Sequence, residues 1–363
     1  MDLPFLTADL SGIGGALRAR AEDFVVDEVP AYPPSGAGDH VFARIEKRDH
    51  ATPFAVKLIA AALGVQARDI GTAGLKDRRA VTTQWISLPP PVTPDAVAAL
   101  ALEGIRVLEV ARHNHKLRTS HLRANRFRLR VRGVTDGAAE RARAILVRLA
   151  EAPGAPNFYG EQRFGRAGDN AARGRAILLG ERSRDRSRDR FFVSSLQAEL
   201  FNAWLAARLA DDLYRTALPG DVMHKRPRDG APGGMFDCAD AAAETARLAA
   251  GEIVPTGPMF GDRMRRPADR TPAAAREAAI LDGAGIPREA WAAVRALAEG
   301  TRRDAAIPIT DASASVEPLE PGTVDVAFTL PAGAYATTVM REVMKAEPEP
   351  EPGADPEPEL TRE

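Results

Sequence analysis

The segment from residue 71 to 85, GTAGLKDRRAVTTQW, places a single acidic residue among three cations. Asp77 is flanked by Lys76, Arg78 and Arg79, whose positive charges favour the ionised carboxylate. A carboxylate that stays an anion suits covalent attack on an electrophile, or stabilisation of a cationic intermediate, better than it suits accepting a proton. A surface turn with solvated charges has the same pattern, because structural ion pairs also shift pKa values. This segment alone leaves both interpretations open.

A second segment, residues 111 to 132, carries eight Lys or Arg residues, three of the six histidines and no acid. Such cations repel one another unless an anion neutralises them, and nucleic acid backbones are the usual long anion. Arginine is favoured throughout this chain, since only six of its 49 basic residues are lysine. An arginine cluster is therefore weaker evidence for nucleic-acid binding here than in most proteins. We still expect contact with RNA or DNA rather than a solvated strand face. His113, His115 and His121 have no carboxylate or cysteine beside them, which argues against a metal site.

Within the basic segment, alternation places Asn125 and Phe127 on one face of a strand together with Leu129 and Val131. The local pattern favours an ordinary core position for Phe127. The alternative is that its ring stacks on an extruded base, while Asn125 reads the edge of that base.

Residues 157 to 165, NFYGEQRFG, combine three aromatic residues with two glycines. Glycine allows close approach of the backbone, aromatic rings stack, and Gln162 and Arg163 can donate to a base or a phosphate. A buried junction between domains would have the same composition, so both interpretations remain. By contrast, RSRDRSRDR (182 to 190) alternates in charge and is more typical of a solvated loop.

The composition is that of a globular protein, with 45% apolar and 27% charged residues, and 363 residues are enough for two domains. No apolar run is long enough to span a membrane, and the first residues do not resemble a secretory signal, so we expect a cytoplasmic protein.

Cys238 is the only cysteine, which excludes an internal disulfide. The tail from residue 346 to 363 has a net charge of −6, so residues 1 to 345 have a net charge of +5. Its Glu-Pro pattern predicts disorder.

The pattern of helices and strands predicts an interrupted α+β domain. Alternating strands are expected at 41–48, 127–132 and 323–330, and Thr-Pro starts with Gly stops predict helices at 52–64, 93–104 and 271–283. Between residues 156 and 308 strand alternation is scarce and helical spacing dominates, with one helix expected after a Ser194-Ser195 cap. We therefore expect a catalytic domain built from 1–155 and 309–345, and an inserted, mostly helical domain at 156–308.

Five motifs, taken together, resemble the tRNA pseudouridine synthase D (TruD) family. They are AEDFVVDE, AGLKDRRAVTTQW, the pair RHNHKLR and NRF, NFYGEQRFG, and LPAGAYATTVMRE, in the family's order over residues 17 to 344. The resemblance implies a pseudouridine-synthase-type α+β catalytic domain with a mainly antiparallel sheet, interrupted by an inserted TRUD domain. It agrees with the interruption expected from the helix and strand pattern.

The resemblance also assigns roles to individual residues. Asp77 falls at the position of the catalytic aspartate, and Arg18 stands where a lysine can partner that carboxylate. Arginine keeps the charge and can bind bidentately, so an altered ion pair is expected. Phe127 matches the aromatic that stacks on the target base. The remaining substrate contacts implied or expected are Phe24, Lys76, Asn125, Gln162, Arg163 and Tyr335, the last standing where phenylalanine is common.

The implied reaction is isomerisation of uridine to pseudouridine, with uridine 13 in the D arm of tRNA as the family's usual target. It exchanges no atoms or electrons with a cofactor, in keeping with the lack of a nucleotide-binding motif. Asp77 could attack C1′ or C6, or remove a ribose proton, and the sequence does not choose. We expect tRNA as partner, a monomer, and neither metal nor membrane. The alternatives are a non-catalytic RNA-binding or ribosome-assembly factor, which should lack the aspartate, and a glycosidase, which normally needs paired acids.

Overall fold

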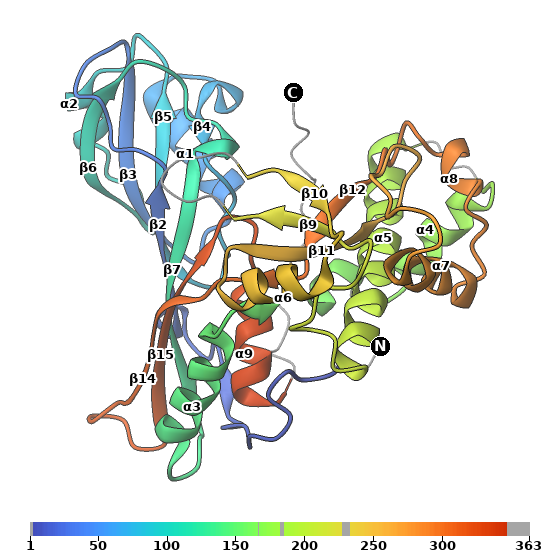
Figure 1. Ribbon diagram of the computed structural model, residues 1–363. Coiled ribbons are helices and arrows are strands. Elements are labelled where there is room, and N and C mark those ends of the chain that lie inside the picture. Colours follow the sequence, from blue (N-terminus) through green and yellow to red (C-terminus); the bar gives the residue numbers. More distant parts are fainter. Residues whose placement is uncertain (1–2, 166, 182–184, 227–232, 347–363) are drawn as a thin grey trace.

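The computed structural model describes residues 3–165, 167–181, 185–226 and 233–346. Figure 1 shows a long sheet on one side of the molecule and a second part, made of helices and a smaller sheet, packed beside it. The expectation of a disordered tail concerns residues that lie outside the described ranges, except for Ala346. No helix in the described ranges is long and apolar enough to cross a membrane.

The large sheet combines strands from both ends of the sequence, and its neighbouring strands are antiparallel except for the parallel pair β2–β5. Two short strands, β1 (Ala16–Leu17) and β4 (Gly71–Thr72), pair with β7 and β5. The main order is β14 (Thr310–Val316), β15 (Thr323–Pro331), β7 (Leu122–Arg132), β2 (Phe24–Pro30), β5 (Val81–Leu88), β3 (His40–Arg48) and β6 (Ile105–His113).

Strand β7 forms as its alternation predicts. Phe127, Leu129 and Val131 are buried on one face, while the arginines between them lie on the other. Pairing with β2 on one side and β15 on the other places Phe127 directly between Val26 and Phe328. β2 lies about 100 residues before β7 in the chain, and β15 lies about 200 residues after it. Distant segments of the chain therefore meet at this strand.

Two sets of helices complete the catalytic domain. α1 (Thr52–Leu63) begins at its Thr-Pro pair, ends at Gly64 with φ of 67°, and packs on β3 and β5 through Val56 and Ile59. α3 (Ala138–Ala150) and α9 (Ala336–Met344) cover the β14–β15–β7 half of the sheet (Figure 1). The expected helix at 93–104 is shorter than predicted, because α2 (Pro94–Ala98) ends before the turn into β6. Short 3₁₀ turns are η1 (Ala21–Asp23), η2 (Ala67–Asp69) and η3 (Thr119–His121).

The chain enters and leaves the inserted domain side by side. β8 (Ala155–Pro156) pairs with β13 (Ala306–Ile307), so the two crossings are held together by main-chain hydrogen bonds. We propose boundaries at 155/156 and 308/309 on this basis. Between them lie η4 (Glu161–Phe164), α4 (Asn170–Leu178), α5 (Arg186–Ala210), α6 (Ala241–Ala249), α7 (Pro272–Gly283) and α8 (Ala290–Ala293).

Two features of the inserted domain differ from expectation. α5 starts at Arg186, capped by Asp185, so the Ser194-Ser195 cap and the solvated loop over the described residues 185–190 were wrong. A four-stranded sheet was also missed, in the order β10 (Met235–Asp237), β9 (Val222–Lys225), β11 (Ile253–Met259) and β12 (Thr301–Asp304). Every residue of β11 is buried, so this strand has no alternation to detect.

Candidate active site

The loop between β4 and β5 carries Asp77 at the centre of the large sheet. Its backbone is fixed by Lys76, whose N–H donates to the Thr52 hydroxyl at 3.0 Å. That hydroxyl in turn donates to Oε1 of Gln84 on β5 at 2.8 Å. The start of α1 therefore holds the loop, while the Asp77 side chain remains 34% exposed. An anchored backbone with an accessible carboxylate suits a group that acts on a bound substrate.

Arg18 is the cation that contacts this carboxylate. Its Nη2 lies 3.2 Å from Oδ1 of Asp77, and its guanidinium stacks on the Phe24 ring, 3.9 Å from the centroid. The Arg18 side chain is only 8% exposed, so its charge is compensated mainly by Asp77 and the aromatic face. Its backbone has φ of 64°, which is unfavourable for a residue with a side chain. Strain of this kind persists where surrounding contacts require it, often at functional sites.

The flanking cation Lys76 does not pair with Asp77 as we expected. Its Nζ lies 2.8 Å from Oε2 of Glu28, and both side chains are almost fully buried. Glu28 Oε1 also accepts the Trp85 N–H at 3.0 Å. The pair joins β2, β5 and the Asp77 loop. A substrate contact by Lys76 would require this buried pair to break, so we leave Lys76 out of the proposed base-binding set.

Phe24, Phe127 and Asn125 lie on strands next to the Arg18–Asp77 pair. Phe127 meets the Phe24 ring edge to face at 6.3 Å, and the Phe328 ring at 5.6 Å. With 5% exposure it belongs to the apolar core, as its local pattern indicated. Asn125, two residues earlier on the same face, has a buried Oδ1 without a hydrogen-bond partner among the described residues. An unpaired amide oxygen is costly to bury, so it is available to a ligand.

The other expected substrate contacts are spread over the neighbouring elements. Tyr335, half-buried, immediately precedes α9 and follows the strand that pairs with Asn125. Gln162 is exposed on η4. The Arg163 guanidinium donates to the Ser194 hydroxyl at 2.7 Å and lies near the Tyr159 and Phe191 rings. These contacts give Arg163 a role in packing η4 on α5.

Residues 157–160 of NFYGEQRFG are held by contacts with other parts of the inserted domain, so both interpretations of this motif stay predictions. Asn157 is buried, and its side-chain N–H donates to the Asp304 carbonyl at 2.8 Å. Tyr159 and Asn202 exchange two hydrogen bonds, at 2.8 and 2.9 Å. The first half of the motif is therefore fixed against β12 and α5 within the inserted domain, while Gln162 stays accessible.

The basic segment is only partly available to RNA. Arg130 pairs with Asp325 at 2.7 Å and also with Glu317, while Arg132 pairs with Asp23 at 2.6 Å. Acids on β15, η1 and the turn before β15 thus neutralise its final part, so the expectation that an external anion does this was wrong there. The exposed cations without an ion pair in the described chain lie earlier, at Arg112, Lys116, Arg118, Arg123 and Arg126.

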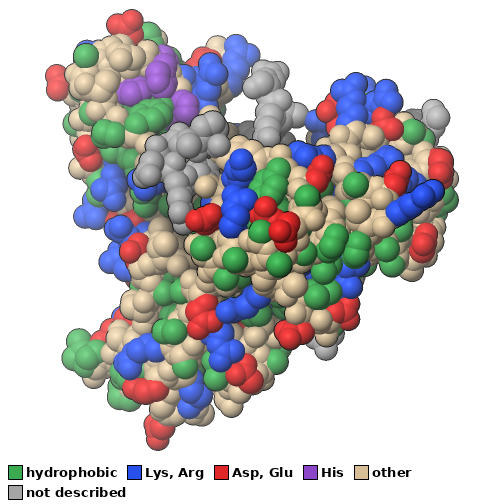
Figure 2. All heavy atoms as spheres, viewed as in Figure 1, with side chains coloured by type: hydrophobic (Ala, Val, Ile, Leu, Met, Phe, Trp, Pro, Cys, Tyr) green, Lys and Arg blue, Asp and Glu red, His purple; other side chains and the backbone are tan. Residues whose placement is uncertain are grey.

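The rings of His113, His115 and His121 cluster around Tyr32. Figure 2 shows histidine side chains grouped on the surface at the end of the large sheet that β3 and β6 form. Ser35 N–H donates to Nδ1 of His113 at 3.0 Å, and the Nε2 atoms of His113 and His115 are 3.2 Å apart. The Tyr32 hydroxyl lies 2.5 Å from Nδ1 of His121. Within the described ranges these rings form no group of three ligands suited to a metal ion.

This arrangement disfavours protonation of two of the rings. Burial, and then repulsion by His115, His121 and His40, lower the pKa of His113 below its usual value. Burial, His115 and Arg118 likewise lower the pKa of His121. Nδ1 of His121 also accepts the Arg118 N–H at 3.2 Å, a bond that a proton on this atom would break. The neutral forms are therefore the ones the fold stabilises.

Acidification is expected to destabilise this region. Because the folded pKa values lie below the unfolded value of about 6.5, the unfolded chain binds more protons, and stability falls as the pH drops below about 6.5. The melting temperature should therefore decrease more steeply between pH 7 and pH 5 in the wild type than in His121→Asn, whose Oδ1 replaces Nδ1 as acceptor and cannot titrate. Equal slopes in the two proteins would contradict the assignment.

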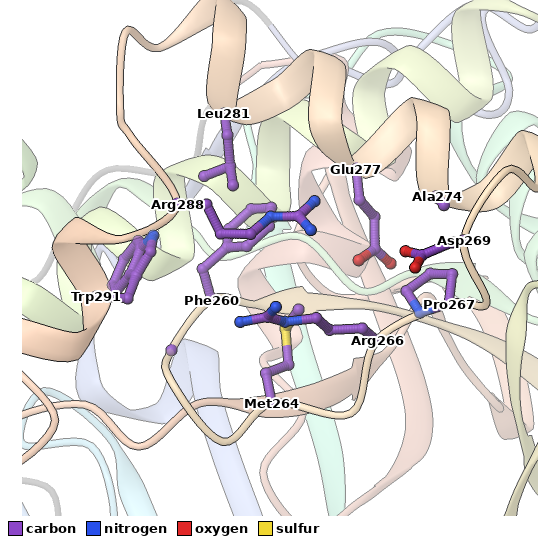
Figure 3. A pocket seen from close by; sticks show the side chains of 11 residues that line it. Phe260, Met264, Arg266, Pro267, Asp269, Ala274, Glu277, Leu281, Arg288 and Trp291 are labelled. Carbon is purple, nitrogen blue, oxygen red and sulfur yellow. The ribbon is translucent and has the colours of Figure 1, made fainter.

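A separate hollow in the inserted domain shares no lining residue with the Asp77 site. Figure 3 shows the residues that line it, among them Arg266, Arg288, Phe260 and Trp291. Its volume of about 40 Å³ could hold only a few water molecules. Glu277 on its wall is neutralised by the buried Arg302 at 2.7 Å.

The family model for tRNA pseudouridine synthase D (TruD) matches residues 1–185 and 182–343 of the chain. A protein from Anaeromyxobacter dehalogenans named tRNA pseudouridine synthase D is 53% identical over 361 residues, which cover 98% of this chain and 99% of the relative. One of the same name from Thermus thermophilus is 42% identical over 358 residues, covering 98% and 96%. A crystal structure from Methanosarcina mazei carrying the TruD name matches with a TM-score of 0.77 at 23% identity, over 96% of this chain and 99% of that one.

The split α+β domain, its mainly antiparallel sheet and the mostly helical insertion are the architecture of a pseudouridine synthase of the TruD type. Within that architecture the Asp77 carboxylate contacts Arg18, whose guanidinium stacks on the Phe24 ring. The chain belongs to the tRNA pseudouridine synthase D family.

Proposed function

We propose that this protein converts uridine 13 in the D arm of tRNA to pseudouridine, with Asp77 as the nucleophilic carboxylate. The observation that carries the proposal is the accessible Asp77 carboxylate on an anchored loop, 3.2 Å from the nearly buried Arg18. A non-catalytic RNA-binding protein would have no use for this arrangement. A single acid paired with a cation also does not provide the two carboxyl groups of a glycosidase.

In the proposed reaction the N1–C1′ bond of uridine breaks, the uracil turns, and C5 bonds to C1′ while the C5 proton is released and N1 gains one. The target nucleotide leaves the stack, and Asn125 contacts its base edge with its unpaired Oδ1. Phe127, Phe24 and Tyr335 provide the aromatic surroundings. Arg18 pairs with the Asp77 carboxylate and orients it, and this carboxylate attacks C1′ or C6 or removes a ribose proton.

Docking of the tRNA is proposed to use the exposed cations of the segment from Arg112 to Arg126, with the inserted domain on the other side and Gln162 at its edge. The working form is proposed to be a cytoplasmic monomer that needs no metal. Phosphate contacts of this kind predict affinity that decreases with rising salt concentration.

The test is to incubate unmodified tRNA transcripts with the protein and map pseudouridine by a chemical adduct that stops reverse transcription. We expect one new stop, at position 13, and none in a transcript with cytidine at that position. Modification at a different uridine would overturn the choice of position. No pseudouridine in any tRNA would overturn the catalytic assignment.

A further inference from the structure

Lys47 is a fully buried lysine at the end of an apolar strand face. It follows Val41, Ala43 and Ile45 on β3 with the alternation of a strand, and its exposure is 0%. Lysine is almost never fully buried unless its charge has partners, because removing an ammonium from water is costly. No motif in the sequence marks this lysine as a functional residue.

The Lys47 ammonium group donates to main-chain carbonyls. Its Nζ donates to the Asp77 carbonyl at 2.7 Å, to the His50 carbonyl at 2.5 Å and to the Lys76 carbonyl at 3.3 Å. Three carbonyls match the three N–H donors of an ammonium group. The side chain thus ties the segment that enters α1 to the loop that carries the aspartate.

The contact with the carbonyl of Asp77 itself links Lys47 to catalysis. Arg18 binds the Asp77 carboxylate from one side, and Lys47 binds the same residue's backbone from within the fold. Main-chain placement decides where the carboxylate points, and an error of about 1 Å at a reacting group can cost about a hundredfold in rate. The buried position leaves Lys47 no direct access to RNA.

We propose that Lys47 is a positioning residue. By holding the main-chain carbonyls of Lys76 and Asp77, it keeps the Asp77 carboxylate in the position from which it attacks. The inference rests on the proposed function. It adds a residue that no motif assigns, acting on the turnover step rather than on tRNA binding.

The test compares Lys47→Met, which keeps the side-chain length and removes the charge and donors, with Ile59→Ala. Ile59 is fully buried in the same core on α1, and its truncation lowers stability without touching the Asp77 loop. Per folded molecule, Lys47→Met should lower kcat by about a hundredfold with KM for tRNA within about threefold. Ile59→Ala should keep both. A kcat for Lys47→Met within about threefold of wild type, or an equal loss in Ile59→Ala, would overturn the proposal.

Hydrogen exchange provides a readout that needs no activity. Amides of residues 73–80 should exchange at least about tenfold faster in Lys47→Met than in Ile59→Ala. Equal exchange would overturn the positioning role even if the wild type proved inactive on tRNA, an outcome that would refute the proposed function separately. Should the methionine variant not fold, Lys47→Arg carries the same comparison. It keeps the charge but moves the carbonyls, so a lowered kcat is expected and an unchanged one contradicts the proposal.

Discussion

Asp77→Asn is expected to abolish pseudouridine formation while leaving tRNA affinity nearly unchanged. The amide has the shape of the carboxylate, and its oxygen can still accept from Arg18, but it has lost the negative charge and the nucleophilic oxygen. The backbone contacts of the loop do not depend on this side chain. Single-turnover formation of pseudouridine and tRNA binding by filter retention would measure the two quantities on the same preparation.

A nearby acid serves as control for Asp77→Asn. Asp49 lies in the turn after β3, and its N–H donates to the Ala80 carbonyl at the end of the same loop. Its side chain is 56% exposed, so Asp49→Asn removes a charge close to the loop without altering the proposed nucleophile. We expect normal turnover from this control. Turnover of Asp77→Asn within about tenfold of wild type would refute the catalytic assignment.

Phe127→Leu is expected to lower turnover by about tenfold to a hundredfold, since base stacking on an aromatic ring is worth about 1–3 kcal/mol. The structure adds a stability cost to this prediction, because Phe127 packs between Phe24 and Phe328 with 5% exposure. Replacing a core ring by leucine should cost about 1 kcal/mol. Both effects are measurable on one sample, by single-turnover rate and by melting temperature.

Phe328→Leu is the matched control for Phe127→Leu. Phe328 lies directly opposite on β15, is fully buried, and contacts the same ring, so the two substitutions remove the same group from the same core. Phe328→Leu should lower the melting temperature and leave turnover per folded molecule intact. If the two variants lose equal turnover, or if Phe127→Leu loses only stability, Phe127 is a core residue and the base stacks elsewhere.

Local chemistry in the sequence was enough to predict several elements and the family. β3, β7 and β15 form where side chains alternate, and α1 and α7 start at their Thr-Pro pairs. These signals persist because backbone propensity and one-sided burial act over a few residues. The interruption of the catalytic domain followed from the same local patterns, and the motif order implied the TruD family, which the comparisons confirmed.

The partners of the charged groups were decided only by tertiary structure. Arg18 and Asp77 are 59 residues apart in the chain, and Arg130 and Asp325 are 195 apart. Strand order brings such residues together, and no local pattern encodes it. Lys76 was therefore given the wrong partner, the acids that pair with the basic segment were not predicted, and neither were the burial of Lys47 and its hydrogen bonds to three carbonyls. The sequence by itself determined which residues could do chemistry. The packing of β1, β2, β3 and the Asp77 loop determined which of them meet, because charge pairing depends on distance in space.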